Sequence, residues 1–247
     1  MSIDPGSINI AAADMLSAFQ RRVDGIPYER KGILYSEMFF LYLCAQSAMP
    51  NRVVESGRAR GQSTLMLSTI FSDSQVVSIE SDPHSPDVQD AQERLRGRNN
   101  VSLRFGDATR ILPAEVRQGD VVLIDGPKGF RGLRLALRLL ATGKLKQVFV
   151  HDCALGSEER AFLDAHLRGA LYSDSIEFAR IARVLDAGCW AEIPPDRRFD
   201  GERPPHAYGY GLACIPFDPT APYRTLFARA VVAGIRSRFA HSIASHG

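Results

Sequence analysis

The sequence lacks a long apolar run, a metal-type cysteine spacing and an excess of one charge. Its longest apolar stretch, residues 38–46, is far shorter than the roughly 20 residues of a membrane-spanning helix, and no signal-peptide pattern opens the chain. The four cysteines are widely dispersed, which favours buried, reduced thiols. A net charge of +2 is too small to indicate nucleic-acid or membrane binding. These absences predict a soluble, cytoplasmic enzyme that binds neither nucleic acid nor membrane.

Two common nucleotide-binding motifs are also missing. The turn after the first expected strand reads Glu55-Ser-Gly57-Arg-Ala-Arg-Gly61-Gln-Ser63-Thr64. It has neither the Gly-x-Gly-x-x-Gly fingerprint of dinucleotide-binding folds nor the Gly-Lys-Ser/Thr of a P-loop. Its two glycines permit positive φ angles and a close approach of the backbone to a ligand. An ordinary strand–helix turn is the alternative interpretation.

What the sequence does contain is a regular alternation of short β-branched runs and helical segments. Strands are expected at residues 52–55, 75–80, 100–105, 120–125 and 146–151, with helices at 63–71, 86–97 and 132–141. Such βαβ repeats predict a parallel sheet. Two preceding helices, at 11–23 and 36–48, are interpreted as a cap on this sheet. Because the composition does not shift along the 247 residues, we expect one domain.

The C-terminal part is less regular. We expect a helix at 158–171, a sixth strand within 178–190, a mobile loop at 194–206, a last strand at 209–216 and a basic helix at 223–239. Long loops of this kind are often functional. Substrate specificity is therefore expected to depend on this loop and on the N-terminal cap.

Acidic side chains stand at the ends of all five of the first strands. They are Glu55, Glu80, Asp107, Asp125 and the pair His151–Asp152. Each of them alone is explained as well by a helix cap or a solvated carboxylate. Ligands of doubly wound sheets bind at the carboxyl ends of parallel strands, however, so the set predicts a binding site there.

Individual positions suggest individual roles. Glu80 lies 23 residues after Gly57 and could accept hydrogen bonds from a ribose diol, a feature common to NAD and S-adenosylmethionine sites. Asp107 could bind an adenine amine. Asp125 and Lys128, in Asp-Gly-Pro-Lys, would face the reacting group, although these four residues also make a good turn.

Together these motifs resemble class I S-adenosylmethionine-dependent methyltransferases. The resemblance covers about residues 50–155 and is nearest to small-molecule O-methyltransferases, including catechol-type and cephalosporin-hydroxylase-like members. It implies a Rossmann-like α/β fold, with a seven-stranded, mostly parallel sheet, helices on both faces and an antiparallel last strand. It also implies S-adenosylmethionine as the cofactor and methyl transfer to an oxygen of a small-molecule acceptor.

The resemblance assigns cofactor binding to the strand ends and the turns after them. These positions are Glu55, Ser56, Gly57, Gly61, Ser63, Thr64, Glu80, Ser81, Asp107, Ala108, Asp125 and Gly126. Around the acceptor it places Asp125, Lys128, His151 and Asp152. We interpret His151 as the general base, because an imidazole ordinarily titrates near neutrality; a buried core histidine is the alternative.

A metal is left open but is not favoured. Metal-dependent relatives carry acidic ligands after the fourth and fifth strands, where this chain has Asp125 and Asp152. Those side chains supply two of the oxygens that Mg²⁺ prefers, and no third is evident. With His151 they could instead bind a transition metal.

The chain departs from the family pattern in its glycine turn. Ala59 replaces the middle glycine, and Arg58 and Arg60 flank it. These arginines could bind an anionic substrate or the cofactor carboxylate, or face solvent. The departures keep two alternatives open, an NAD-dependent oxidoreductase and a non-catalytic S-adenosylmethionine-binding protein.

Two further patterns concern partners. Arg131, Arg134 and Arg138 share a helix face and, with nearby lysines, make a basic patch. This patch is either a solvated face or a surface for an acidic substrate or partner. Phe39, Phe40 and Tyr42 could form the interface of a homo-oligomer.

Overall fold

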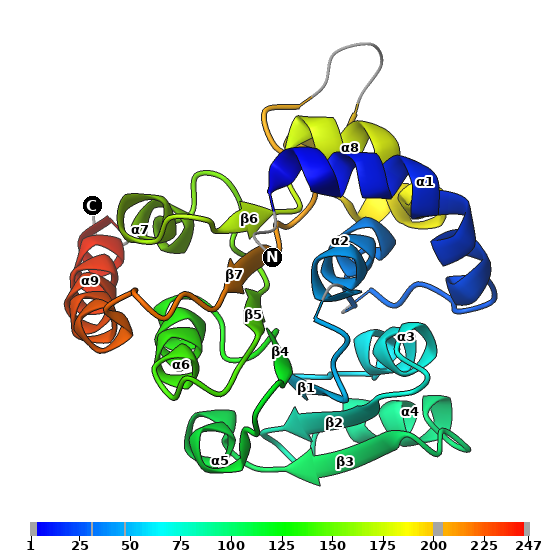
Figure 1. Ribbon diagram of the computed structural model, residues 1–247, viewed down its shortest axis with the longest axis horizontal. Coiled ribbons are helices and arrows are strands. Elements are labelled where there is room, and N and C mark those ends of the chain that lie inside the picture. The colour runs from blue at the N-terminus through cyan, green and yellow to red at the C-terminus, as the bar shows by residue number, and fades with distance from the viewer. Residues whose placement is uncertain (1–3, 31, 47, 200–204, 245–247) are drawn as a thin grey trace.

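A seven-stranded sheet runs through the part of the chain that the computed structural model describes, residues 4–30, 32–46, 48–199 and 205–244 (Figure 1). The strands are β1 (Arg52–Ser56), β2 (Gln75–Glu80), β3 (Val101–Phe105), β4 (Val121–Ile124), β5 (Gln147–Val150), β6 (Leu171–Tyr172) and β7 (Ala213–Pro216). Their order is β3-β2-β1-β4-β5-β7-β6. Strands β1 to β5 pair in parallel, and β7 pairs antiparallel with both β5 and β6. This is the class I methyltransferase fold, so the predicted fold class is confirmed.

Helices cover both faces of the sheet (Figure 1). One face carries α1 (Pro5–Val23), α2 (Tyr35–Gln46), α3 (Gln62–Ile70), α4 (Asp87–Arg94) and α8 (Ile176–Ala182). The other carries α5 (Ala108–Glu115), α6 (Phe130–Leu140), α7 (Glu158–His166) and α9 (Tyr223–Ala244). Two 3-10 helices, η1 (Arg183–Glu192) and η2 (Pro195–Arg197), follow α8.

The central strands are apolar throughout because both of their sides are covered. In β4, Val121 and Leu123 pack against the α1–α3 side, whereas Val122 and Ile124 pack against the α6 side. A strand that is buried on both faces has no place for alternating polar residues. The uninterrupted β-branched runs of the sequence therefore mark the middle of the sheet.

The aromatic residues of α2 lie inside the chain. Phe39 packs against Phe19 of α1, with their ring centroids 4.7 Å apart and the ring planes tilted by 43°. Phe40 meets the edge of Phe178 of α8 at 5.4 Å. Tyr42 is also buried. The proposed interface through Phe39, Phe40 and Tyr42 is therefore wrong, because these rings fasten the N-terminal cap to the core.

The expected sixth strand within 178–190 is also wrong. Those residues belong to α8 and η1, and the edge strand is β6. Ser175 caps α8 by accepting the backbone N–H of Phe178 at 3.4 Å. Phe178, Ala179 and Ala182 are buried at helical spacing, so their apolar pattern had period 3.6 and not 2. Part of the expected loop at 194–206 forms η2, and residues 200–204 lie outside the described residues.

Within the described residues, no helix combines the length and the apolar character needed to cross a membrane.

Candidate functional site

The turns after β1 and β4 touch at the carboxyl edge of the sheet. Gly57 has φ +84°, and a Cβ there would lie 2.7 Å from the backbone nitrogen of Gly126. Gly61 has φ +78° at the start of α3, where a Cβ would press on Ala91. The hydroxyl of Ser56 donates to the carbonyl of Gly126. Both glycines are thus required by the local geometry: Gly57 lets the two turns touch, and Gly61 lets the start of α3 pack closely on α4.

Glu55 lies beneath the glycine turn. It is fully buried, and its Oε2 accepts hydrogen bonds from the hydroxyls of Thr64 and, at 2.7 Å, Ser78. Burial raises the pKa of the Glu55 carboxyl. Ser63 is buried beside it. Three of the residues assigned to the cofactor therefore support the glycine turn through buried contacts: Glu55, Ser63 and Thr64.

Glu80 binds the same turn from the end of β2. Its Oε2 accepts the backbone N–H groups of Arg58 and Ala59, each at 3.2 Å. Its Oε1 accepts the N–H of Ser81 at 2.7 Å. The carboxylate thus stands between the glycine turn and the loop after β2, the position in which a ribose diol would meet it.

Arg58 lies inside the protein. Its side chain is 3% exposed, and Nη1 donates to the carbonyl oxygens of Ser78 and Arg104 at 3.0 Å each. The guanidinium carbon lies 4.7 Å from the centroid of the Phe105 ring. Burial lowers the pKa of Arg58. Arg58 therefore ties the glycine turn to β2 and β3 through Nη1.

Arg60 is already paired with acidic side chains. It binds Glu29 at 2.8 Å and Asp87 at 2.9 Å. Ala59, between the two arginines, adopts φ +43°. A non-glycine residue rarely takes this conformation, so the turn keeps the path of a glycine motif at some cost in strain.

Asp107 has the contacts of a helix cap. Its Oδ1 accepts the N–H of Thr109 at 2.9 Å at the start of α5, and the hydrogen bond from the Thr109 side chain lowers the pKa of Asp107. Ala108 is the first residue of that helix and is buried. Both residues follow the carboxyl end of β3, at the same edge of the sheet as the glycine turn, as the sequence predicts.

A charged cluster occupies the ends of β4 and β5. The Nζ of Lys128 lies 2.5 Å from Oδ1 of Asp125 and 2.7 Å from Oδ2 of Asp152. Nδ1 of His151 lies 2.6 Å from the same Oδ1 of Asp125. Asp152 has φ +57°, an uncommon conformation for this residue type that turns its carboxylate toward Lys128. The four residues assigned to the acceptor are therefore in mutual contact.

Glu37 joins this cluster; the sequence pointed to the N-terminal cap around Ser36–Glu37 for substrate specificity, but not to this contact with His151. Its Oε2 lies 3.0 Å from Nε2 of His151, and its Oε1 accepts the backbone N–H groups of Tyr210 and Gly211 at 2.9 and 2.8 Å. The residue is 1% exposed. A signal was present in the sequence, because Glu37 is the single acidic residue in the mostly apolar segment 35–46.

Two carboxylates beside His151 favour its protonated form. Burial by itself would lower its pKa, but the charges of Asp125 and Glu37 outweigh burial and raise the pKa of His151 to about 10. In turn, His151 and Lys128 hold the pKa of Asp125 well below its usual range, despite its burial. An imidazolium that donates from both nitrogens has no lone pair for a proton. The general-base role of His151 stays a prediction, while its contacts make the residue a link between Glu37 and Asp125.

Lys128 binds the two carboxylates that a metal ion at this cluster would need as ligands. Asp125, His151 and Asp152 each offer a ligand atom, and these atoms lie within 4.8 Å of one another. However, the two carboxylates already share the ammonium of Lys128, whose pKa they raise against the effect of burial. His151 would also have to lose a proton before it could ligate a cation. The residues fit a lysine-centred cluster better than a divalent metal.

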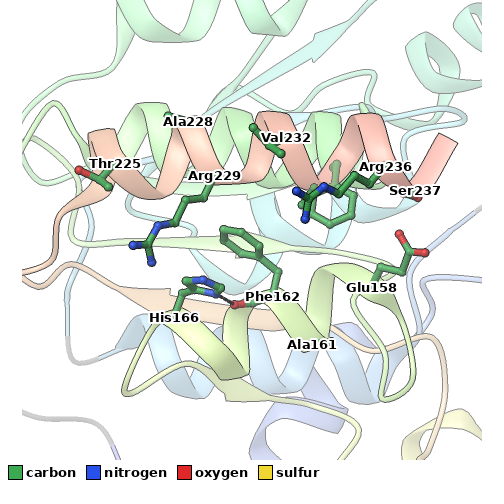
Figure 2. A pocket seen from close by; sticks show the side chains of 12 residues that line it. Glu158, Ala161, Phe162, His166, Thr225, Ala228, Arg229, Val232, Arg236 and Ser237 are labelled. Carbon is green, nitrogen blue, oxygen red and sulfur yellow. Dashed lines mark hydrogen bonds between the residues drawn. The ribbon is translucent and has the colours of Figure 1, made fainter. Parts of the chain in front are cut away.

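A separate groove of about 810 Å³ lies between α7 and α9 (Figure 2). Phe162 of α7 and Val232 of α9 form its apolar floor, and Arg229 and Arg236 extend over it from α9 (Figure 2). Its lining comes from α6, α7 and α9 and not from the strand ends. The groove is therefore distinct from the charged cluster.

Comparison with known proteins gives distant relations of fold. No protein-family model matches the chain. No curated protein matches it either. Among solved structures, it is similar to a methyltransferase from Podospora anserina with bound S-adenosylhomocysteine, at 14% identity and a TM-score of 0.46 over 88% of this chain and 98% of that one. It is also similar to the O-methyltransferase TomG from Streptomyces achromogenes in complex with S-adenosylmethionine, at 17% identity and a TM-score of 0.47 over 86% and 96%. Likeness at this level does not extend to activity.

Proposed function

We propose that the chain is an S-adenosylmethionine-dependent methyltransferase that methylates a hydroxyl oxygen of a small-molecule acceptor. The observation that carries the proposal is the position of two carboxylate sites on one edge of a sheet with this strand order. Glu80 lies on the β2 side of the Gly57–Gly126 contact, and the Lys128 cluster lies on the β4–β5 side. One site suits a ribose, and the other suits a reacting hydroxyl.

The cofactor would lie over the glycine turn. Glu80 would accept hydrogen bonds from the ribose, and the positive-φ backbone at Gly57 and Gly61 would allow the ligand to approach closely. Asp107 would border the adenine. Glu55 and Arg58 hold this turn in place from beneath. When bound, S-adenosylmethionine supplies a methyl group on a sulfonium sulfur and leaves as S-adenosylhomocysteine.

The charged cluster would prepare the acceptor oxygen. The ammonium of Lys128 donates to the oxygen and stabilises the negative charge that develops as the hydroxyl proton leaves. Asp152, whose side chain is 40% exposed, takes this proton and passes it to solvent. His151 and Glu37 fix Asp125, and Asp125 fixes Lys128. These residues act by positioning and electrostatics, which are the principal requirements of a methyl displacement.

Ligand-dependent thermal stability tests the cofactor. We expect saturating S-adenosylhomocysteine to raise the melting temperature and NADH to leave it unchanged, because only a ligand of the native state shifts unfolding. Glu80→Ala should abolish the shift, whereas Glu93→Ala, on the exposed side of α4, should retain it. A shift with NADH alone would support the oxidoreductase instead. A shift with S-adenosylhomocysteine, but no methyl transfer to any acceptor in a broad panel of hydroxyl compounds, would support a non-catalytic binding protein.

A further inference from the structure

Three arginines from two helices line one small pocket beside Lys128. The pocket has a volume of about 230 Å³ and lies where the start of α6 meets the C-terminal half of α9. Arg131 and Arg134 come from α6, and Arg238 comes from α9. Lys128 also lines the pocket, two residues before α6 begins. Two arginines of the expected basic patch are thus joined by Arg238, which lies 104 positions after Arg134 in the chain.

The packing of α9 on α6 brings the arginines together. A Cβ at Gly234 would lie 2.8 Å from Cβ of Phe130, so the absence of a side chain lets α9 lie directly against the first turn of α6. Arg134 is held near this contact, because its Nε donates to the carbonyl oxygen of Phe130 at 3.1 Å. This bond directs the guanidinium back along the helix toward its start, where Lys128 stands.

The three arginines of this pocket form no close ion pair within the described chain, whereas Lys128 is paired with Asp125 and Asp152. No ion pair there joins Arg131, Arg134 or Arg238 to a carboxylate, whereas Arg60 binds three acidic side chains and Arg160 binds two. Burial lowers the pKa of Arg134, and the charges of Arg238 and Arg131 lower it further. Like charges gathered in this way repel one another, so a bound anion would relieve the repulsion.

Glu159, the acidic residue that lines the pocket, does not balance the charges of the three arginines. Glu159 of α7 places its Oε1 beside Gly129, 3.3 Å from where a Cβ would stand. One carboxylate faces three guanidiniums, and among the described residues it pairs with none of them. Guanidinium groups match the geometry of phosphate and carboxylate oxygens. The pocket therefore has the chemistry of an anion site.

Building on the proposed methyl transfer, we infer that this pocket binds an anionic group, a phosphate or a carboxylate, carried by the methyl acceptor. Lys128 is the link, because it lines the pocket and also places its Nζ between Asp125 and Asp152. One small molecule can then hold its anionic group against Arg134 and Arg238 and present its hydroxyl at the Lys128 cluster. The acceptor class is accordingly an acidic hydroxyl compound.

Calorimetric titration with pyrophosphate, and with malonate as a carboxylate probe, tests the site in the full chain. We expect saturable binding of at least one of the two at constant ionic strength. Arg134→Gln and Arg238→Gln should each weaken it about tenfold or more, as expected when a hydrogen bond to a charged group is lost. Arg224→Gln is the matched control. It removes the same charge from α9, but it lies at the other end of the helix beside a different hollow, so binding should be unchanged.

Three results obtained without the cofactor product would overturn the inference. They are no saturable binding of either probe, an equal loss in all three variants, and tighter binding of an RNA oligonucleotide through the same arginines, which would indicate a nucleic-acid surface. Saturation with S-adenosylhomocysteine separates this inference from the proposed function. If both bind together, the pocket is distinct from the cofactor site, as an acceptor subsite must be. If S-adenosylhomocysteine displaces the probe, the acceptor role is wrong. If it does not bind at all while the arginine-dependent titration persists, the methyltransferase proposal fails and the anion site stands.

Discussion

Glu37 of α2 accepts a hydrogen bond from Nε2 of His151 at the end of β5, with 3.0 Å between the two atoms. This contact joins the N-terminal helical cap to the edge of the sheet where the strand ends gather. Through His151 it reaches Asp125 and Lys128. The cap is therefore part of the candidate site as well as a cover for the core.

Replacing Glu37 should destabilise the protein. Glu37→Gln removes the negative charge that binds His151 and leaves one oxygen for the N–H groups of Tyr210 and Gly211. Loss of buried hydrogen bonds to a charged group predicts a decrease of about 1.5–3 kcal/mol in the free energy of unfolding, measured by urea denaturation. Glu93→Gln, on the exposed side of α4, is the control. Equal stabilities of the two variants would show that the Glu37–His151 contact contributes nothing.

The protonation of His151 gives a pH dependence of defined sign. Its pKa is about 10 in the folded chain and near 6.5 when unfolded, so its contribution to stability is complete below pH 6.5 and is lost as the pH rises toward 10. The unfolding free energy of the parent protein should fall more steeply over this range than that of His151→Gln. Nitrogen-15 NMR at pH 7 should show both ring nitrogens protonated. A neutral imidazole at that pH would support the general-base role of His151.

The buried carboxyl group of Asp186 gives a second pH dependence, in the acidic range. Asp186 of η1 accepts the N–H of Ser36 at 3.1 Å and the hydroxyl of Tyr208 at 3.0 Å, and its burial raises the pKa of Asp186 to about 7. Its folded pKa exceeds its unfolded value, so its stabilising contribution is full below about pH 4 and is lost as the pH rises to 7. Relative to Asp186→Asn, the parent protein should lose up to about 4 kcal/mol over that interval. Parallel stability curves for the two proteins would contradict the raised pKa.

Lys128 determines whether a metal can take part. Lys128→Met should lower the rate constant for methyl transfer about 10²- to 10³-fold, as the loss of one donor to a developing oxyanion does elsewhere. It should also free the carboxylates of Asp125 and Asp152, so that MgCl₂ raises the melting temperature of the variant but not of the parent protein. Parent activity should survive EDTA. Activity that vanishes with EDTA and returns with Mg²⁺ would instead establish a metal at this cluster.

Gly57 tests the contact between the two turns. Gly57→Ala and Gly25→Ala both place alanine at a positive φ, but only the first meets neighbouring backbone, 2.7 Å from the nitrogen of Gly126. Gly25→Ala should lower the free energy of unfolding by about 1–2 kcal/mol, from backbone strain alone. Gly57→Ala should lower the free energy of unfolding further than Gly25→Ala does. Only Gly57→Ala should abolish the thermal shift with S-adenosylhomocysteine. Similar losses in both variants would mean that the close approach at Gly57 is unimportant.

The strands and the strand-end residues could be predicted because their signals are local. Apolar runs such as 121–124 are buried on both faces, and a parallel sheet brings the residues after each strand to one edge. Segment 178–190 was mistaken for a strand because a short apolar run fits either period. Helix α5 was not anticipated, since it contains Pro113 and follows β3 almost directly.

The chemistry of the candidate site could not be predicted in the same way. The pKa of His151 is set by Asp125 and by Glu37, which is 114 residues away in the sequence. Arg58 and Arg60 could not be placed by pattern alone, because their partners lie on other elements. The residue types in a sequence can indicate where a site lies. The protonation of the side chains there depends on neighbours that only the folded chain brings close.

The most direct test of the central claim is a crystal structure of the protein with S-adenosylhomocysteine. The account predicts the ribose hydroxyls within hydrogen-bond distance of Glu80, the ligand over Gly57, and the thioether sulfur directed toward the Lys128–Asp125 cluster. A ligand bound elsewhere, or a strand-end edge that stays empty at saturating concentration, would contradict it.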